Sequence, residues 1–335
     1  MAAGANAGTS STGAQRPELG LIGGSDVAQA RERLGLASEL FDLAQLDVHY
    51  DPAHATLWTM MNPRGRASFN LALLQDFARW QSLIVDSFGP VDTPELRYIV
   101  LGSRVPGVFC YGGDLNLFVE LIRAGDRAGL VHYGRKCVEI LHRNIDSLGL
   151  PLVTIGMVAG DALGGGWEAL MSFDVIVAER GTKFGLPETM FGLFPGMGAH
   201  AILARKLGRA MAERMILSGQ TYTAEHLYDL GLVHILTDRG GARQAVEDYI
   251  EKETRRHCGR VGAFAAMNRV NPVTLQELCD IVDLWAQSAL RLSEKDIRLM
   301  LRLVSAQTKI NCDPAETVQA TLEPSPFAGD SRLSA

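Results

Sequence analysis

The sequence predicts an α/β fold with right-handed connections between parallel strands. Apolar runs rich in β-branched residues, such as residues 151–158 (PLVTIGMV) and 174–178 (DVIVA), have the length of buried strands. Turns containing glycine follow these runs, and helical stretches follow the turns, so strands and helices alternate. From Val261 onward the strand signals stop and two helical stretches follow, which indicates a separate helical region.

The part of the chain before residue 150 is expected to begin with a hairpin. Two strand-like runs flank the turn sequence Asp-Pro-Ala-His. A helix follows, because its apolar residues recur with the helical period. Asp114 is expected to cap a further helix. In order, the expected elements are strands at residues 46–50 and 56–60, a helix at 70–87, a strand at 97–101, and a helix at 130–148.

The later part of the chain carries three more expected strands before it becomes wholly helical. Its expected strands are residues 151–158, 174–178 and 232–236, and its expected helices are residues 199–218, 242–257, 274–292 and 294–310. The expected organisation is a disordered tail at residues 1–24, a core domain at 25–260, a C-terminal helical region at 261–312, and a flexible tail at 313–335.

Composition excludes several classes of protein. The net charge of −6 gives no reason to expect nucleic acid as a partner. The five cysteines are odd in number, widely spaced and without a CxxC motif, which favours reduced thiols in the cytoplasm over disulfides or a zinc site. The histidines lack metal-ligand spacing, so we expect no metal. We also expect no signal peptide and no membrane span.

Residues 158–170 (VAGDALGGGWEAL) contain the first candidate for chemistry. They indicate the end of a buried strand, a run of glycines, and the start of a helix that carries Glu168. Glycines allow a close approach of the backbone, and the free N–H groups of a helix start can stabilise an oxyanion. A nearby carboxylate can transfer a proton. The alternative is a close contact between helix and strand, with Glu168 serving only the helix N-terminus.

Two further turns have the same character. Glu188 follows the next strand, in the sequence Gly-Leu-Pro-Glu, and Gly113 follows an upstream strand, in the sequence Tyr-Gly-Gly-Asp. Successive loops after parallel strands meet at one edge of a sheet. We therefore expect Glu168 and Glu188 to lie close together.

These turns resemble those of a known family. Phe109 with Gly112-Gly-Asp, residues 160–168, and Pro187-Glu188 with residues 195–198 (PGMG) resemble the signature of the crotonase (enoyl-CoA hydratase/isomerase) superfamily. Within that superfamily, residues 112–118, 121–127 and 185–199 resemble the bacterial diffusible signal factor (DSF) synthases, which make cis-2-unsaturated fatty acid signals.

The resemblance implies a crotonase (ClpP/crotonase-like) ββα superhelix, whose C-terminal helical region covers an acyl pocket. It also implies a homotrimer or a dimer of trimers, and no cofactor beyond the carrier of the substrate. By the family pattern, the site residues are Glu168 and Glu188 for catalysis, Gly113 and Gly165 for the oxyanion hole, and Trp167, Met190 and Trp285 for the acyl pocket.

Two carboxyl groups suffice to remove water from a 3-hydroxyacyl thioester. One takes the C2 proton, and the other protonates the departing C3 hydroxyl. By analogy with the hydratases, Glu188 handles the C2 proton and Glu168 the oxygen. Apolar neighbours are expected to raise both pKa values. The presence of both carboxylates favours hydratase or dehydratase chemistry over that of isomerases, dehalogenases and decarboxylases of the same fold.

The expected function is therefore dehydration of 3-hydroxyacyl thioesters to 2-enoyl thioesters, cis in a DSF-type synthase, followed by hydrolysis to the free acid. The expected carrier is acyl carrier protein, an acidic partner that the basic clusters around residues 123–136 and 205–214 could bind. Two alternatives stay open. One is a degradative enoyl-CoA hydratase, and the other is an inactive binding protein that holds a sensor kinase or RNA.

Overall fold

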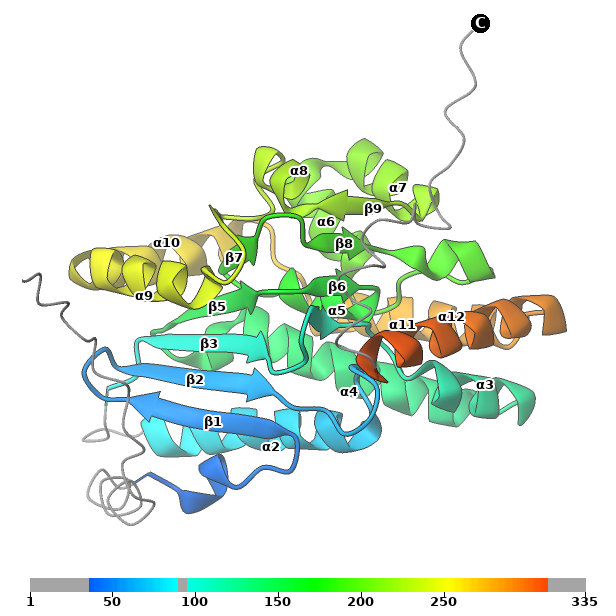
Figure 1. Ribbon diagram of the computed structural model, residues 1–335, viewed down its shortest axis with the longest axis horizontal. Helices are drawn as coiled ribbons and strands as arrows, with labels where there is room; N and C mark the ends of the chain where they lie inside the picture. The colour runs from blue at the N-terminus through cyan, green and yellow to red at the C-terminus, as the bar shows by residue number, and fades with distance from the viewer. Residues whose placement is uncertain (1–35, 90–94, 313–335) are drawn as a thin grey trace, which may run out of the picture.

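The computed structural model describes residues 36–89 and 95–312 (Figure 1). The expected tails, residues 1–24 and 313–335, lie outside the described residues. The predicted hairpin is present: β1 (Leu46–Asp51) pairs antiparallel with β2 (Thr56–Met61). None of the described helices combines the length and the apolar character needed to cross a membrane.

A larger sheet forms the centre of the fold. Its strands follow the order β1-β2-β3-β5-β7-β10, and every pair after β1–β2 is parallel. Every residue of β5 is buried, which explains its unbroken apolar sequence, because helices cover both faces of a parallel sheet. The added strands are β3 (Tyr98–Ser103), β5 (Val153–Val158), β7 (Val175–Glu179) and β10 (Ile235–Thr237).

A smaller sheet lies at the carboxyl ends of these strands, in the order β4-β6-β8-β9. Each of β3, β5 and β7 leads into one of its strands, and a helical segment follows each time. This repeated strand, strand and helix unit confirms the predicted ββα architecture. The short strands, which the sequence pattern did not predict, are β4 (Val108–Cys110), β6 (Asp161–Leu163), β8 (Lys183–Gly185) and β9 (Thr221–Thr223).

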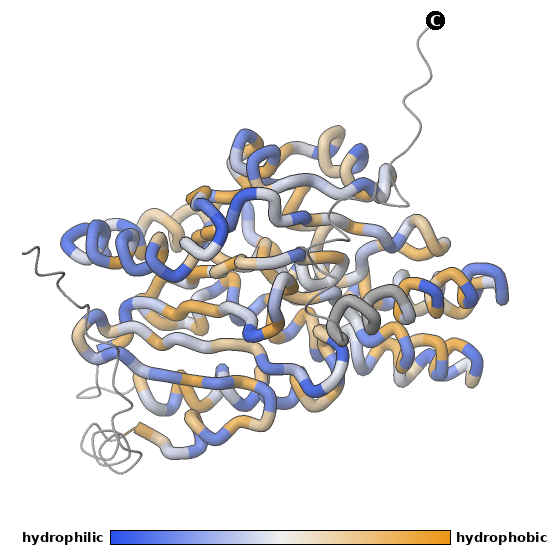
Figure 2. The backbone as a smooth tube through the Cα atoms, in the orientation of Figure 1, coloured by the Kyte–Doolittle hydropathy of each residue, from blue (hydrophilic) through white to orange (hydrophobic). Residues whose placement is uncertain are grey.

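Helices cover both faces of the larger sheet. On one face, α2 (Leu71–Phe88) and α4 (Arg127–Ile145) bury residues such as Trp80 in the main core cluster, and α2 lies behind β1 and β2 in Figure 1. On the other face, α9 (Ala242–Glu253) packs against β5 and β7. Figure 2 shows that α9 is largely hydrophilic, which fits a helix that buries one narrow stripe.

The helical region at the C-terminal side contains one helix that the sequence pattern did not predict, α10 (His257–Val270). The two predicted helices are present as α11 (Leu275–Ala289) and α12 (Glu294–Cys312). Helix α11 packs on α4, and α12 packs on α3 (Leu115–Arg123). In Figure 1 the arrowheads of β2 and β3 point toward the side where α3, α11 and α12 lie.

The single helix expected at residues 199–218 is wrong. The structure has two helices there, α6 (Ala199–Leu207) and α7 (Arg209–Ser218). Gly208 separates them with a φ of +79° and a ψ of 156°, a backbone conformation that favours glycine and ends the first helix. The remaining elements are η1 (Ser38–Phe41), η2 (Ser147–Gly149), α5 (Gly165–Leu170), η3 (Pro187–Phe191), α8 (Ala224–Asp229) and η4 (Thr254–Arg256).

Candidate active site

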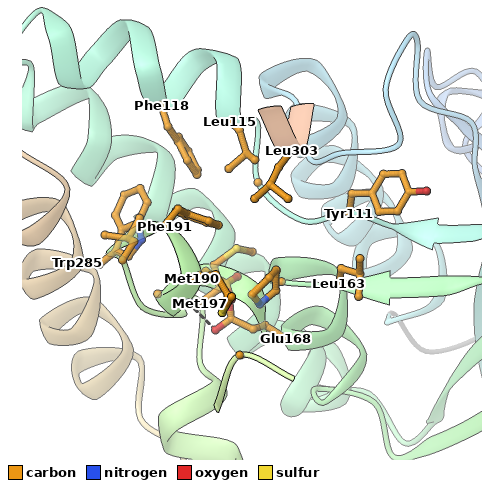
Figure 3. Close-up of a pocket in the computed structure, with 18 of the residues that line it drawn as sticks. Tyr111, Leu115, Phe118, Leu163, Glu168, Met190, Phe191, Met197, Trp285 and Leu303 are labelled. Carbon is orange, nitrogen blue, oxygen red and sulfur yellow. Dashed lines mark hydrogen bonds between the residues drawn. The ribbon is translucent and has the colours of Figure 1, made fainter. Parts of the chain in front are cut away.

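A cavity of about 320 Å³ lies where the turns after β4, β6 and β8 meet the C-terminal helices. Its size is that of a small-molecule site. The three candidate turns of the sequence therefore converge, as the parallel connections predicted. Of the residues expected at the site, the cavity lining contains Gly113, Gly165, Glu168, Glu188, Met190 and Trp285 (Figure 3).

The two glycine turns touch each other at the cavity wall. A Cβ atom placed on Gly112 would lie 2.5 Å from the Gly165 nitrogen, and Gly112 has a φ of +86°. Helix α5 begins at Gly165, so its N–H has no partner within the helix. Among the described residues, neither the Gly113 N–H nor the Gly165 N–H has a hydrogen-bond acceptor. Two free donors at one wall can stabilise an oxyanion.

Glu168 lies in α5 with its side chain almost fully buried, at 1% exposure. Its Oε1 accepts hydrogen bonds from the Met197 N–H at 2.8 Å and the Ala199 N–H at 3.0 Å. Burial raises the pKa of Glu168 to about 7, and the hydrogen bonds from these backbone N–H groups limit the rise. The Met197 and Ala199 contacts were not predicted from the sequence.

Glu188 lies in the first turn of η3, and its environment differs from that of Glu168. Its Oε2 is buried and has no hydrogen-bond partner among the described residues. Burial raises the pKa of Glu188 well above its ordinary value, and the neighbouring Glu168 carboxylate raises it further. Since Glu168 has donors for its carboxylate and Glu188 Oε2 has none, a single proton shared by the pair resides on Glu188.

The absence of a side chain at Gly164 leaves room for the carboxyl group of Glu188. A Cβ atom on Gly164 would lie 2.6 Å from Glu188 Oε1, and Gly164 has a φ of +53°. Both facts favour glycine at this position. The run of three glycines was visible in the sequence, but only Gly165 among them was assigned a role there.

The apolar wall of the cavity comes from segments far apart in the sequence. Phe118 of α3 packs edge-on against Trp285 of α11, with ring centroids 5.0 Å apart. Leu303 of α12 also lines the cavity, so the C-terminal helices contribute to its cover. Figure 3 shows Tyr111 on the opposite side from Trp285. On the more polar part of the lining are Tyr111, Asp161 and Lys183.

Trp167 corrects one expectation, because it does not line this cavity. Its side chain is buried, with ring centroids 6.2 Å from Phe184 and 6.3 Å from Tyr222. Consecutive residues of a helix point in directions about 100° apart. Since Glu168 faces the cavity, Trp167 faces the core beside the smaller sheet.

Ion pairs within the protein occupy several arginines of the basic clusters. Two arginines of α4 share the carboxylate of Asp283 on α11. Nη2 of Arg127 lies 3.2 Å from its Oδ1, and Nη2 of Arg135 lies 3.2 Å from its Oδ2. Arg123 of α3 lies 3.2 Å from Glu294 of α12. Arg205 of α6 likewise lies 2.8 Å from Glu277. These contacts connect the C-terminal helices to the core domain and reduce the charge available for an acidic partner.

Among the described residues, no group of three or more His, Cys, Asp and Glu side chains could hold a metal ion.

The sequence matches the model of a known family and several curated relatives. The family model for enoyl-CoA hydratase/isomerase matches residues 55–251. A probable mitochondrial enoyl-CoA hydratase 2 of Arabidopsis thaliana is 33% identical over 148 residues, which are 44% of this chain and 47% of the relative. The 2,3-dehydroadipyl-CoA hydratase of Escherichia coli K12 is 32% identical over 177 residues, 53% of this chain and 63% of the relative. The chain spans about half the length of the curated relatives that it matches.

Solved structures give the same picture of the fold. Pseudomonas aeruginosa DspI matches with a TM-score of 0.56 and 27% identity, covering 68% of this chain and 85% of DspI. Human mitochondrial delta3-delta2-enoyl-CoA isomerase matches with a TM-score of 0.64 and 19% identity, covering 80% of this chain and all (100%) of that chain. The second likeness concerns the fold alone.

Proposed function

Because the chain belongs to the enoyl-CoA hydratase/isomerase family, whose model matches residues 55–251, we propose that it interconverts 3-hydroxyacyl and 2-enoyl thioesters in this cavity. The observation that supports this most is the buried Glu168 and the half-buried Glu188, whose Oε2 is buried, beside two backbone N–H groups that have no acceptors among the described residues. Burying carboxyl groups destabilises the fold, and groups with such perturbed pKa values are concentrated at functional sites. An inactive binding protein would have no need for this combination.

The proposed dehydration proceeds through an enolate. One glutamate takes the C2 proton, and the negative charge moves to the thioester oxygen, where the N–H groups of Gly113 and Gly165 stabilise it. The electron pair then forms the C2–C3 double bond while the C3–O bond breaks. The other glutamate gives its proton to the departing oxygen, so that water leaves. The pair has gained one proton and lost one.

The family resemblance assigns the C2 proton to Glu188 and the oxygen to Glu168. With its proton on Glu188, the resting pair is set to add water to an enoyl thioester, because Glu188 can protonate C2 while Glu168 activates water. Dehydration starts from the reverse distribution, with the proton on Glu168. Both directions need one proton in the pair.

The rate is expected to depend on pH as a bell-shaped curve. Below a pH of about 7, Glu168 becomes protonated while Glu188 is already protonated, so no base remains and kcat/KM falls. At higher pH, Glu188 loses its proton and no acid remains. These limits belong to the pair as a whole. Measurement of kcat/KM across the neutral range tests this. A steady rise as the pH falls below neutrality would contradict the assignment.

We further propose a DSF-type activity, in which the acyl group is carried by acyl carrier protein, the product is cis, and the thioester is hydrolysed to the free acid. The sequence resemblance of residues 112–118, 121–127 and 185–199 supports this. The internal ion pairs of Arg127, Arg135 and Arg205 weaken the argument from charge. Assembly as a homotrimer or a dimer of trimers, and binding of a sensor kinase, stay predictions of the resemblance.

A competing function is that of an enoyl-CoA hydratase in degradation. One observation favours it: the curated relatives include CoA hydratases. The two functions differ in carrier and product. We expect kcat/KM to be at least about tenfold higher with a 3-hydroxyacyl group on acyl carrier protein than on CoA, a difference of about 1.4 kcal/mol, with free acid as the product. Equal use of both carriers and an intact thioester would favour the hydratase.

A further inference from the structure

An arginine with a largely buried side chain contacts the loop that carries Gly113. Arg66 follows β2, and its side chain is only 9% exposed. Its Nη2 lies 3.5 Å from the Gly113 carbonyl oxygen and 3.4 Å from Asp114 Oδ1. Neither the sequence pattern nor the family resemblance pointed to this residue. We call residues 111–114 the oxyanion loop.

The segment after Arg66 runs beside the oxyanion loop and is bonded to it. The Tyr111 N–H donates to the Ala67 carbonyl at 2.7 Å, and the Phe69 N–H donates to the Gly112 carbonyl at 2.8 Å. The Tyr133 hydroxyl also donates to the Phe69 carbonyl. These backbone contacts hold the loop on both sides of Gly112.

Gly113 itself takes no part in these backbone bonds. Its N–H has no acceptor among the described residues, and the hydrogen bond that its carbonyl accepts comes from Arg66. The next residue, Asp114, caps α3 by accepting hydrogen bonds from the N–H groups of Asn116 and Leu117. The Arg66 guanidinium therefore joins the Gly113 carbonyl to the capped start of α3 and limits rotation of the backbone at Gly113.

The charge of Arg66 is only partly compensated. Asp114 is its single ion-pair partner among the described residues, and Nε and Nη1 are buried without hydrogen-bond partners. Burial lowers the pKa of the guanidinium, and Asp114 raises it, but an arginine stays charged. Buried donors without partners require an explanation. A positive charge held 3.5 Å from the Gly113 carbonyl oxygen would favour negative charge near the Gly113 N–H, and such a role would account for keeping the cation buried.

Resting on the function proposed above, we propose that Arg66 is a positioning residue for the oxyanion hole, which orients the Gly113 N–H toward the thioester oxygen and favours the enolate by its charge. A misplacement of about 1 Å lowers rates about 100-fold. We therefore expect Arg66→Met to lower kcat about 100-fold with little change in KM, since ground-state contacts stay.

The experiment compares kcat, KM and thermal unfolding of the full chain carrying Arg66→Met, Arg66→Lys or Arg64→Met. Arg64 is the matched control, because it lies in the same segment with an exposed side chain. Arg66→Lys keeps the charge without the planar fork, so its kcat should lie between those of the wild type and Arg66→Met. Arg64→Met should match the wild type.

The outcomes separate the two proposals. Turnover by the wild type with an unchanged kcat in folded Arg66→Met would overturn the role of Arg66 alone, as would an equal loss in Arg64→Met. Absence of wild-type turnover would overturn the proposed function and this role with it. If Arg66→Met does not fold, Arg66→Lys decides: a lower kcat at unchanged KM supports the role, and a wild-type kcat overturns it.

Discussion

Glu188→Gln is expected to lower kcat for dehydration by a factor of about 10² to 10⁴, the range for loss of a general acid or base. Glutamine has nearly the same shape but cannot exchange the proton. Oε2 of Glu188 has no hydrogen-bond partner among the described residues, so the substitution breaks no bond there. Glu168→Gln should have a similar effect on kcat, while its amide oxygen can still accept from the N–H groups of Met197 and Ala199.

Glu188→Gln should not destabilise the fold at neutral pH. The pKa of Glu188 is raised in the folded protein, so its contribution to stability is most favourable below its unfolded pKa and is lost as the pH rises through the folded value. Glutamine cannot ionise, so the Glu188→Gln protein does not lose this stability as the pH rises. The unfolding temperature of Glu188→Gln relative to the wild type should therefore rise with pH.

Glu120→Gln provides the control for this experiment. Glu120 is an exposed glutamate on α3, and its loss should change neither kcat nor the unfolding temperature appreciably. Measurement of kcat together with thermal unfolding distinguishes a chemical effect from a structural one. Near-normal turnover in a folded Glu188→Gln protein would remove Glu188 from the mechanism.

Gly112→Ala is expected to lower kcat by a factor of about 10² to 10³, which is the effect of losing one oxyanion-hole donor. The new methyl group would lie 2.5 Å from the Gly165 nitrogen and 3.0 Å from the Leu163 carbonyl oxygen. These are backbone atoms, so the two glycine turns would have to separate. The Gly165 N–H would then leave its place in the cavity wall.

Gly107→Ala is the matched control for Gly112→Ala. Gly107 also has a positive φ, of +69°, but a Cβ atom there would meet no atom of the described residues within 4 Å. Both variants should therefore lose about 1 kcal/mol or more of stability from backbone strain. Only Gly112→Ala should lose kcat. If both variants retained the wild-type kcat, the contact between the turns would have no role in the reaction.

The alternation of strands and helices was enough to predict the fold class, because a parallel sheet covered on both faces requires unbroken apolar strands such as β5. Helix α10 was missed for the opposite reason. Its sequence (HCGRVGAFAAMNRV) contains five Ala and Gly residues, and His257 is the only residue of this helix that is buried, so no apolar period marks it. The break at Gly208 was also missed. A single glycine can occur inside a continuous helix, so its presence in a helical pattern does not indicate the positive φ that separates the two helices.

At the site, the sequence placed Glu168 and Glu188 on successive turns after parallel strands, and the structure brings both to one cavity. It could not show which side of α5 faces the cavity, and Trp167 was therefore misplaced. Contacts across long stretches of chain were equally hidden. The pairing of Arg127 with Asp283 and the approach of Arg66 to Gly113 depend on how separate elements pack, and no local pattern records them.

The central claim is that Glu188, together with Glu168, removes water from a 3-hydroxyacyl thioester in this cavity. Mass spectrometry of the thioester and of any released acid, after incubation with the wild type or with Glu188→Gln, tests it most directly. We predict that the wild type forms a 2-enoyl product lighter by one water molecule, as thioester or free acid, and that folded Glu188→Gln forms almost none. A substrate that the wild type leaves with unchanged mass on both carriers, or equal product from both proteins, would contradict the claim.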